Sequence, residues 1–211
     1  MTKVKATTPC RESKEHVGEP VISLLLVDLG SPHNIGQIIR TSYILGGEKV
    51  RLYIFDPRGR LDHNREEVGL TSVELVGEEG AYTRVDDLEE FLAGYPGRII
   101  ATDITEQAES LVGFQFRRGD LILVGNENRG YRDEPNLREH PGLEHVAERL
   151  IVPMGGKAYG LPDRGSIVPE DHGLYPNLNV AATVAIVTYV ALAQLGYFNE
   201  FGLKDLRRNA S

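Results

Sequence analysis

Three short polar motifs in this sequence carry residue types that could bind a ligand or assist a reaction. The first holds Asn34 and Arg40, the second places Glu127 between two glycines, and the third ends at Asn179. Carboxamide and carboxylate side chains form directed hydrogen bonds, and an arginine fork suits phosphate or carboxylate groups. The motifs contain no histidine or cysteine, so an ordinary general base is missing from them.

Each motif must be positioned by the strand that precedes it. Short apolar or β-branched runs predict strands that are covered on both faces. These runs are residues 21–27, 49–55, 98–103, 120–125 and 149–154. In a parallel sheet, ligands bind just beyond the carboxyl ends of the strands, and that is where the three motifs fall.

Helical patterns alternate with these strands. Residues 30–47 predict an amphipathic helix that ends at two glycines, residues 84–95 predict a short helix, and residues 177–196 predict a helix that is apolar nearly all round and therefore buried. The segment 56–66 is rich in turn residues and predicts a basic loop. The alternation predicts an α/β fold, a single domain with a mostly parallel sheet flanked by helices.

The ends of the chain and one internal stretch differ from this pattern. Residues 1–20 predict a flexible N-terminal tail, residues 21–198 the folded domain, and residues 199–211 a charged C-terminal segment. Residues 155–176 form a long Gly/Pro-rich loop, which is read either as a neutral surface insertion or as a lid that contacts substrate. Loops of this length are uncommon unless they are functional or disordered, which favours the lid.

The composition limits the classes of function. The 211 residues include one cysteine and carry a formal net charge of −8, which argues against a protein that coats nucleic acid by bulk charge. No apolar run reaches the length of a membrane span, and no metal-ligand spacing stands out, so we expect a cytoplasmic protein without a metal. Neither the dinucleotide-binding glycine pattern nor the phosphate-binding loop of nucleotide hydrolases is present.

The three motifs, in this order, resemble those of one enzyme family. N-x-G-x-x-x-R-T at 34–41, G-x-E-x-x-G at 125–130, and V-P-M at 152–154 leading to N-L-N-V at 177–180 look like the motifs of the SpoU branch of the SPOUT RNA methyltransferases. The resemblance covers roughly residues 21–198. The spacing in the first half and the QLGY that ends the last helix look most like the minimal TrmL-type members, which modify the ribose of a tRNA wobble nucleotide.

The resemblance implies a fold, a cofactor and partners. It implies a deep C-terminal trefoil knot, S-adenosylmethionine held in that knot, RNA (tRNA foremost) as substrate, and a homodimer. It also implies catalytic roles for Asn34, Arg40, Glu127 and Asn179. The cofactor contacts that it implies are Thr102, Gly125, Val152, Met154, Asn177 and Leu178, with Asn177 standing where the family usually has serine.

Methyl transfer to a ribose 2′-hydroxyl requires a weak nucleophile to be oriented and to lose its proton. Arg40 is a poor base because its pKa exceeds about 12. We therefore expect its guanidinium, aimed past Gly36 at the loop after the first strand, to fork onto an RNA phosphate and the ribose hydroxyl. A role for Arg40 as the base, assisted by phosphate, is the second option.

Other readings of the same residues stay open. Asn34 could cap its helix with Gln37, Asn179 could cap the last helix, Glu127 could be a solvated loop carboxylate, and Gly125 and Gly130 could be turn formers. At the level of the whole protein, the rivals are a knotted binder of cofactor or RNA without turnover, an rRNA instead of a tRNA methyltransferase, and a nucleotide-dependent oxidoreductase.

Overall fold

The computed structural model describes residues 19–72, 81–105, 107–133, 138–153 and 178–200. Its seven strands form one sheet in the order β3-β2-β1-β6-β4-β7-β5, and every neighbouring pair is parallel. The strands are β1 (Ile22–Val27), β2 (Val50–Phe55), β3 (Thr83–Val85), β4 (Ile99–Thr102), β5 (Glu109–Ser110), β6 (Asp120–Val124) and β7 (Glu148–Ile151). The predicted α/β fold with a parallel sheet is confirmed.

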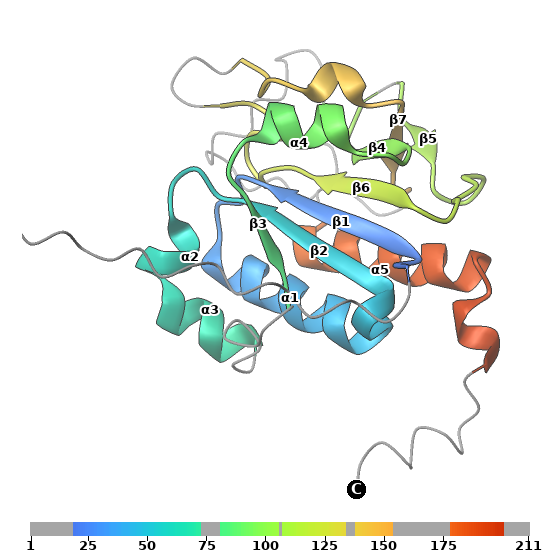
Figure 1. The fold of residues 1–211 in the computed structure, drawn as a ribbon, viewed down its shortest axis with the longest axis horizontal. Coiled ribbons are helices and arrows are strands. Elements are labelled where there is room, and N and C mark those ends of the chain that lie inside the picture. The colour runs from blue at the N-terminus through green and yellow to red at the C-terminus, as the bar shows by residue number, and fades with distance from the viewer. Residues whose placement is uncertain (1–18, 73–80, 106, 134–137, 154–177, 201–211) are drawn as a thin grey trace, which may run out of the picture.

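Helices cover both faces of this sheet (Figure 1). They are α1 (Pro32–Gly46), α2 (Arg60–His63), α3 (Arg65–Ser72), α4 (Leu88–Gly94) and α5 (Val180–Gln194), with short 3₁₀ turns η1 (Gly47–Lys49), η3 (Leu143–His145) and η4 (Tyr197–Glu200). The last helix, α5, packs against the first, α1, on one face, and α4 lies on the other.

Strand β1, which lies inside the sheet, explains why two cores form. All six of its residues are buried. Leu24 and Leu26 belong to the core beneath α1 and α5, whereas Leu25 and Val27 belong to the core beneath α4. Because side chains alternate along a strand, a continuous apolar run is what a strand buried on both faces requires.

The strand order brings the motif loops together. Leu24 of β1 lies opposite Leu52 of β2 on one side and Ile122 of β6 on the other. Strand β4 lies between β6 and β7. The loops that follow β1 and β6 therefore leave the same edge of the sheet side by side, and the ends of β4 and β7 lie next to them.

Two segments differ from the sequence predictions. The predicted helix 84–95 is divided, because Thr83–Val85 pairs with β2 and Asp87 then caps α4 by accepting a hydrogen bond from the Glu90 N–H at 2.9 Å. The predicted loop 56–66 contains α2 and the start of α3. Leu61 and Val68 from these helices are buried in the core with α1, so tertiary packing outweighs the turn-rich composition.

Helix α5 is less buried than predicted. Its side chains Ile186 and Tyr189 are 39% and 55% exposed, and Tyr43 and Ile44 of α1 are 54% and 65% exposed. A helix that is apolar all round was expected to be enclosed, and within one chain the described residues cover only one side of it. Among the described helices, none combines the length and the apolar character that crossing a membrane requires.

Several predictions fall outside the described residues. These concern the trefoil knot expected after β7, the loop 155–176, Met154, Asn177, most of the tail 1–20, and the charged segment beyond Glu200.

Candidate active site

The side chain of Glu127 occupies the centre of the site. Its carboxylate accepts hydrogen bonds from the Gly30 N–H at 2.7 Å, the Ser31 N–H at 3.3 Å and the Asn34 Nδ2 at 2.7 Å. A Cβ atom on Gly30 would lie 3.0 Å from Glu127 Oε2, so glycine allows the carboxylate to reach the backbone. Glu127 is therefore a specific partner of the first motif and not a solvated loop carboxylate.

The third motif joins the same cluster through Asn179. Its Nδ2 donates to Asn34 Oδ1 at 3.1 Å, and its own Oδ1 caps α5 by accepting from the Ala181 and Ala182 N–H groups at 2.9 and 3.4 Å. The amide of Asn34 is thus held from both sides, with its nitrogen toward Glu127 and its oxygen toward Asn179. Among the described residues no other group bonds the second amide hydrogen or the second oxygen lone pair of this buried side chain, which leaves both for a ligand.

Capping roles divide between the two asparagines. Asn179 is the cap that one reading of the sequence proposed, and it holds Asn34 in addition. Asn34 is not a cap, because the Ser31 Oγ accepts from the Asn34 N–H at 3.3 Å and begins α1 three residues earlier. The Asn34 side chain therefore does not cap the helix, and it bonds to Glu127 in the loop after β6.

The loop after β6 is closed on itself by a pair of backbone hydrogen bonds between Asn126 and Gly130. The Asn126 N–H donates to the Gly130 carbonyl at 2.7 Å, and the Gly130 N–H returns a bond of 2.8 Å to the Asn126 carbonyl. Gly130 has a φ of +61°, and a Cβ on Gly125 would lie 2.7 Å from the Gly130 carbonyl carbon and oxygen. Both glycines are therefore required for the turn that presents Glu127.

Asp28 anchors this loop from the end of β1. It is buried and has a φ of +50°, an uncommon conformation for a residue with a side chain. Its carbonyl accepts from Asn126 Nδ2 at 2.6 Å, and its carboxylate pairs with Arg58 and, at 3.3 Å, with Arg129. The side chain thus ties together the loops that follow β1, β2 and β6.

The charge of Asp28 is set by its neighbours. Burial alone would raise the pKa of Asp28, but His140 and Arg58 beside the carboxylate outweigh it and hold that pKa below its usual value. Asp28, Asp133 and His140 place possible metal-ligand atoms within 4.8 Å of one another. Because two arginines already bind the Asp28 carboxylate, we infer no metal site there.

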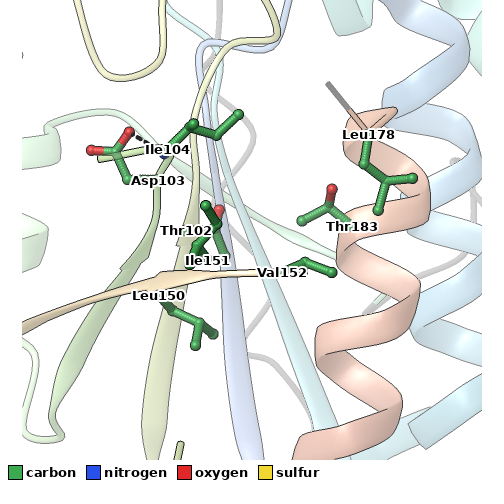
Figure 2. Close-up of a pocket in the computed structure, with 8 residues that line it drawn as sticks. All are labelled: Thr102, Asp103, Ile104, Leu150, Ile151, Val152, Leu178 and Thr183. Carbon is green, nitrogen blue, oxygen red and sulfur yellow. Dashed lines mark hydrogen bonds between the residues drawn. The ribbon is translucent and has the colours of Figure 1, made fainter. Parts of the chain in front are cut away.

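A pocket lies next to this cluster, at the carboxyl ends of β4 and β7 and the start of α5 (Figure 2). Its cavity volume is about 50 Å³, and it is open to solvent. Val152 and Thr183 face each other across it, whereas the Asp103 carboxylate points away from α5 toward Arg149, its ion-pair partner. The lining residues are Thr102, Asp103, Ile104, Leu150, Ile151, Val152, Leu178 and Thr183.

The structure brings together most of the predicted site residues that it describes. Of the predicted cofactor contacts, Thr102, Val152 and Leu178 line this one pocket. Gly125 does not line it, and its close neighbours are Gly130 and Tyr131. Its cofactor contact stays a prediction.

Arg40 is the predicted residue that the structure does not join to the cluster. It is exposed on α1, and among the described residues it has no hydrogen bond or ion pair. Six residues beyond Asn34 is about 9 Å along a helix and two-thirds of a turn around it. Arg40 therefore shares its face of α1 with Tyr43 and Ile44, and its predicted path past Gly36 to the loop after β1 is not observed.

Sequence reasoning missed Asp28, Asn126, Tyr131 and Thr183. A charged residue directly after an apolar strand, as in Val27-Asp28, is a usable signal, because such a residue is rarely buried without a partner. The partners Arg58 and Arg129 are 30 and 101 residues away, so no local pattern could identify them.

The comparisons with known proteins decide the family. The family model described as the SpoU rRNA Methylase family matches residues 21–161, which is more than half of the chain. The chain belongs to this family. The matched span contains the first two motifs, with Asn34 and Glu127, and the pocket residues that come from the ends of β4 and β7.

Relatives of this SpoU family member include enzymes with named substrates. The tRNA (guanosine(18)-2′-O)-methyltransferase of Escherichia coli K12 is 22% identical over 176 residues, which cover 83% of this chain and 65% of that protein. The chain thus spans just under two thirds of the length of the curated relatives that it matches.

Solved structures share the fold. The TrmH/SpoU tRNA modifying enzyme of A. aeolicus aligns with a TM-score of 0.61 at 16% identity and covers 90% of this chain and 86% of its own. AviRb from Streptomyces viridochromogenes, in complex with AdoMet, aligns at 0.60 with 22% identity over 89% and 63%. A structure concerned with 2-OH methylation of C/U34 on tRNA aligns at 0.57 with 26% identity over 85% and 99%.

Proposed function

We propose that this SpoU family protein is an S-adenosylmethionine-dependent RNA methyltransferase that acts on a ribose 2′-hydroxyl, with tRNA as its substrate class. The observation that carries the proposal is the chain of hydrogen bonds from Glu127 through Asn34 to Asn179. It joins all three family motifs, and Asn179 directly follows Leu178, which lines the pocket.

The chemical types of the pocket residues suit a sulfonium nucleoside such as S-adenosylmethionine. Aliphatic side chains suit an adenine ring, and the Thr183 hydroxyl and the strand-end backbone suit a ribose and an amino acid group. When bound, S-adenosylmethionine would supply an electrophilic methyl group. Thr102, Val152 and Leu178 would hold it beside the Asn34 cluster.

The cluster supports orientation of the ribose. Glu127 fixes the rotamer of Asn34, and Asn179 fixes the direction of its amide. The remaining amide hydrogen and lone pair of Asn34 would then hydrogen-bond the ribose hydroxyls, which confines the nucleophilic oxygen to an in-line approach. Such positioning is worth several kcal/mol in transfer reactions, about 7–11 kcal/mol in the best cases.

Arg40 would act on the RNA from outside the cluster. An exposed guanidinium without a partner among the described residues is available to fork onto a phosphate. In the orienting role, Arg40→Lys loses most of the activity at every pH because lysine cannot fork. In the base role, the pH–rate profile of Arg40→Lys shifts toward lower pH. Full activity of Arg40→Lys would contradict the fork.

The choice of tRNA rests on the relatives. The structure concerned with C/U34 of tRNA is covered almost entirely by the match and has the highest identity of the three structures named above. The Escherichia coli relative is named for guanosine 18 of tRNA. The family description names rRNA, which makes rRNA the alternative substrate.

Two further features complete the proposal. The exposed apolar side chains of α1 and α5, namely Tyr43, Ile44, Ile186 and Tyr189, support a homodimer through these two adjacent helices. In such a dimer Arg40 would face the second copy. Family membership supports a trefoil knot formed by the chain after β7.

Two assays test the function. Purified protein with tritiated S-adenosylmethionine should label bulk tRNA and not bulk rRNA, and mass spectrometry of RNA from cells with and without the gene should find one ribose methylation missing. Label in rRNA alone would establish the alternative substrate. Cofactor binding by calorimetry without transfer to either RNA would establish the silent binding protein, and binding of NAD without S-adenosylmethionine would revive the oxidoreductase.

A further inference from the structure

Tyr131 directly follows the loop that carries Glu127, and the proposed chemistry does not use it. Its side chain is only 4% exposed and lies in the core beneath α4 with Ala101 and Leu123. Its hydroxyl oxygen lies 2.8 Å from the carbonyl oxygen of Thr102 and 2.8 Å from that of Leu123. A buried phenol is expected to have such a partner, and here one of the two, Thr102, lies at the end of β4 and lines the pocket, whereas Leu123 lies on the neighbouring strand β6.

The side chain of Thr102 also bonds to one of these two carbonyls. Its hydroxyl donates to the Leu123 carbonyl at 3.0 Å. The carbonyl of Leu123 therefore lies within hydrogen-bond distance of both hydroxyls, and the one proton of the Tyr131 phenol is shared between the Thr102 and Leu123 carbonyls. Since Thr102 lines the pocket, the Tyr131 hydroxyl connects the pocket wall to the loop after β6.

The loop is fixed at its other end as well. Asn126 donates to the Asp28 carbonyl at 2.6 Å, and Glu127 comes next in the chain. The Tyr131 ring limits the space at the base of the loop, since a Cβ on Gly125 would lie 3.1 Å from its Cε1 atom. The loop that holds Glu127 is thus attached at one end to Asp28, just after β1, and at the other end to Thr102 of β4.

The phenol is also suited to remain a donor. Burial raises the pKa of Tyr131 above its usual value, and the hydrogen bond to Thr102 only partly offsets that effect. The hydroxyl therefore keeps its proton throughout the pH range in which the enzyme would work.

We propose that Tyr131 is a positioning residue that holds the Thr102 wall of the cofactor pocket in register with the loop carrying Glu127. It touches neither substrate nor cofactor and acts through Thr102. The inference rests on the proposed function, because it assigns S-adenosylmethionine to this pocket. It implies that cofactor binding and the order of the 125–131 loop are coupled.

The test compares two tyrosine-to-phenylalanine variants that each remove one hydroxyl. Tyr131→Phe loses the bonds described above, and Tyr95→Phe loses a 3.2 Å bond to the Gly119 carbonyl at the opposite end of the sheet. We expect Tyr131→Phe to weaken S-adenosylmethionine binding about 5- to 10-fold by calorimetry, in line with one lost hydrogen bond. The KM for the cofactor should rise with it while the KM for RNA stays constant, and Tyr95→Phe should bind normally.

A second measurement does not depend on turnover. In the wild-type protein, adding S-adenosylmethionine should slow amide hydrogen exchange in residues 125–131, and this protection should be lost in Tyr131→Phe but kept in Tyr95→Phe. Unchanged affinity and protection in Tyr131→Phe, or an equal loss in Tyr95→Phe, overturns the inference. Absence of S-adenosylmethionine binding by the wild-type protein overturns the proposed function and the inference together.

Discussion

At the scale of single residues, the site depends on groups that fix one another. Glu127 accepts three hydrogen bonds, two from the backbone and one from Asn34. Asn34 in turn is bound by Asn179. A carboxylate in this position acts as a template for the first motif, because its oxygens collect the donors that begin α1 and the amide that would meet the ribose.

Glu127→Gln should lower methyl transfer about 100-fold while the protein stays folded. Glutamine has one acceptor oxygen in place of two, and its amide hydrogens would face the donors of Gly30, Ser31 or Asn34. Initial rates with labelled cofactor and a thermal melt measure the two effects. The matched control is Glu144→Gln, whose exposed side chain lies elsewhere and should leave the rate unchanged; a fully active Glu127→Gln would contradict the template role.

Asp28 should make the protein sensitive to acid. Its pKa is lowered in the folded state, so its ionised form adds stability that is fully present above the unfolded pKa, near 3.9, and is lost as the pH falls through the folded value. Urea unfolding from about pH 3 to about pH 7 should therefore show a steeper acid loss in wild type than in Asp28→Asn. Asp86→Asn, at an exposed position, is the control. Parallel curves for wild type and Asp28→Asn would argue against this role.

At the scale of elements, the parallel sheet does most of the positioning. The three motifs come from parts of the chain up to 145 residues apart, yet each follows a strand or begins a helix at one edge of the sheet. Loops are the variable part of such folds, and here the loop after β6 is made rigid by its own backbone pair and by two anchors.

Gly125→Ala should disturb this loop. The new Cβ would lie 2.7 Å from the Gly130 carbonyl group, so the loop must shift, at a cost of about 1–3 kcal/mol in unfolding free energy and with a loss of activity. Gly94→Ala, where a Cβ meets nothing within 4 Å, should be neutral or slightly stabilising. Chemical unfolding and initial rates measure both variants. Equal behaviour of the two would contradict the close approach.

The sequence predicts the elements better than their contacts. The strands β1, β2, β4, β6 and β7 were expected within a few residues, because buried parallel strands are continuous apolar runs. Strand β3, helix α3 and the buried ion pairs of Asp28 were not expected. The two-residue strand β5 has no apolar pattern, and α3 and the Asp28 pairs exist only because distant segments pack against them.

The site shows the same division. Asn34, Glu127 and Asn179 were expected as a set because their three motifs resemble those of one family, and the structure joins them by hydrogen bonds. Arg40 was expected beside them, but helix geometry turns it toward the exposed face of α1. The spacing of two residues fixes their relative directions only when both lie in the same helix. The motif does not show that α1 begins at Ser31, before Asn34, and so it does not show that Asn34 and Arg40 point in different directions.

At the scale of the whole molecule, the unevenly covered helix α5 is the feature that one chain does not explain. A helix that is apolar all round is found where both of its sides are enclosed. The net charge of −8 also suits a protein that gathers its arginines on limited surfaces. Pairing of two copies through α1 and α5 would enclose the exposed apolar side chains and bring the two Arg40 side chains to the same interface.

Ile186→Glu should prevent the proposed dimer from forming and leave a monomer. A carboxylate in an apolar interface is left without a partner, which costs several kcal/mol. Sedimentation or light scattering should report twice the chain mass of 23.4 kDa for wild type and a single chain mass for the variant. Val112→Glu, at a valine that is 84% exposed near β5, should leave the mass unchanged. A monomeric wild type, or a variant that stays dimeric, would contradict this interface.

The strand order also governs how the chain comes together as it is made. Strand β1 pairs with β6, which comes about a hundred positions later in the chain, since Leu24 lies opposite Ile122. The hydrogen-bond partner of the Asn34 amide, Asn179, is synthesised later still. At ribosomal rates of about 5–20 residues per second, one side of the most apolar strand stays open for roughly 5–20 s. Late pairing of this kind slows folding and exposes apolar surface, and the hydrogen bonds from Glu127 through Asn34 to Asn179 can be complete only when the start of α5 has left the ribosome.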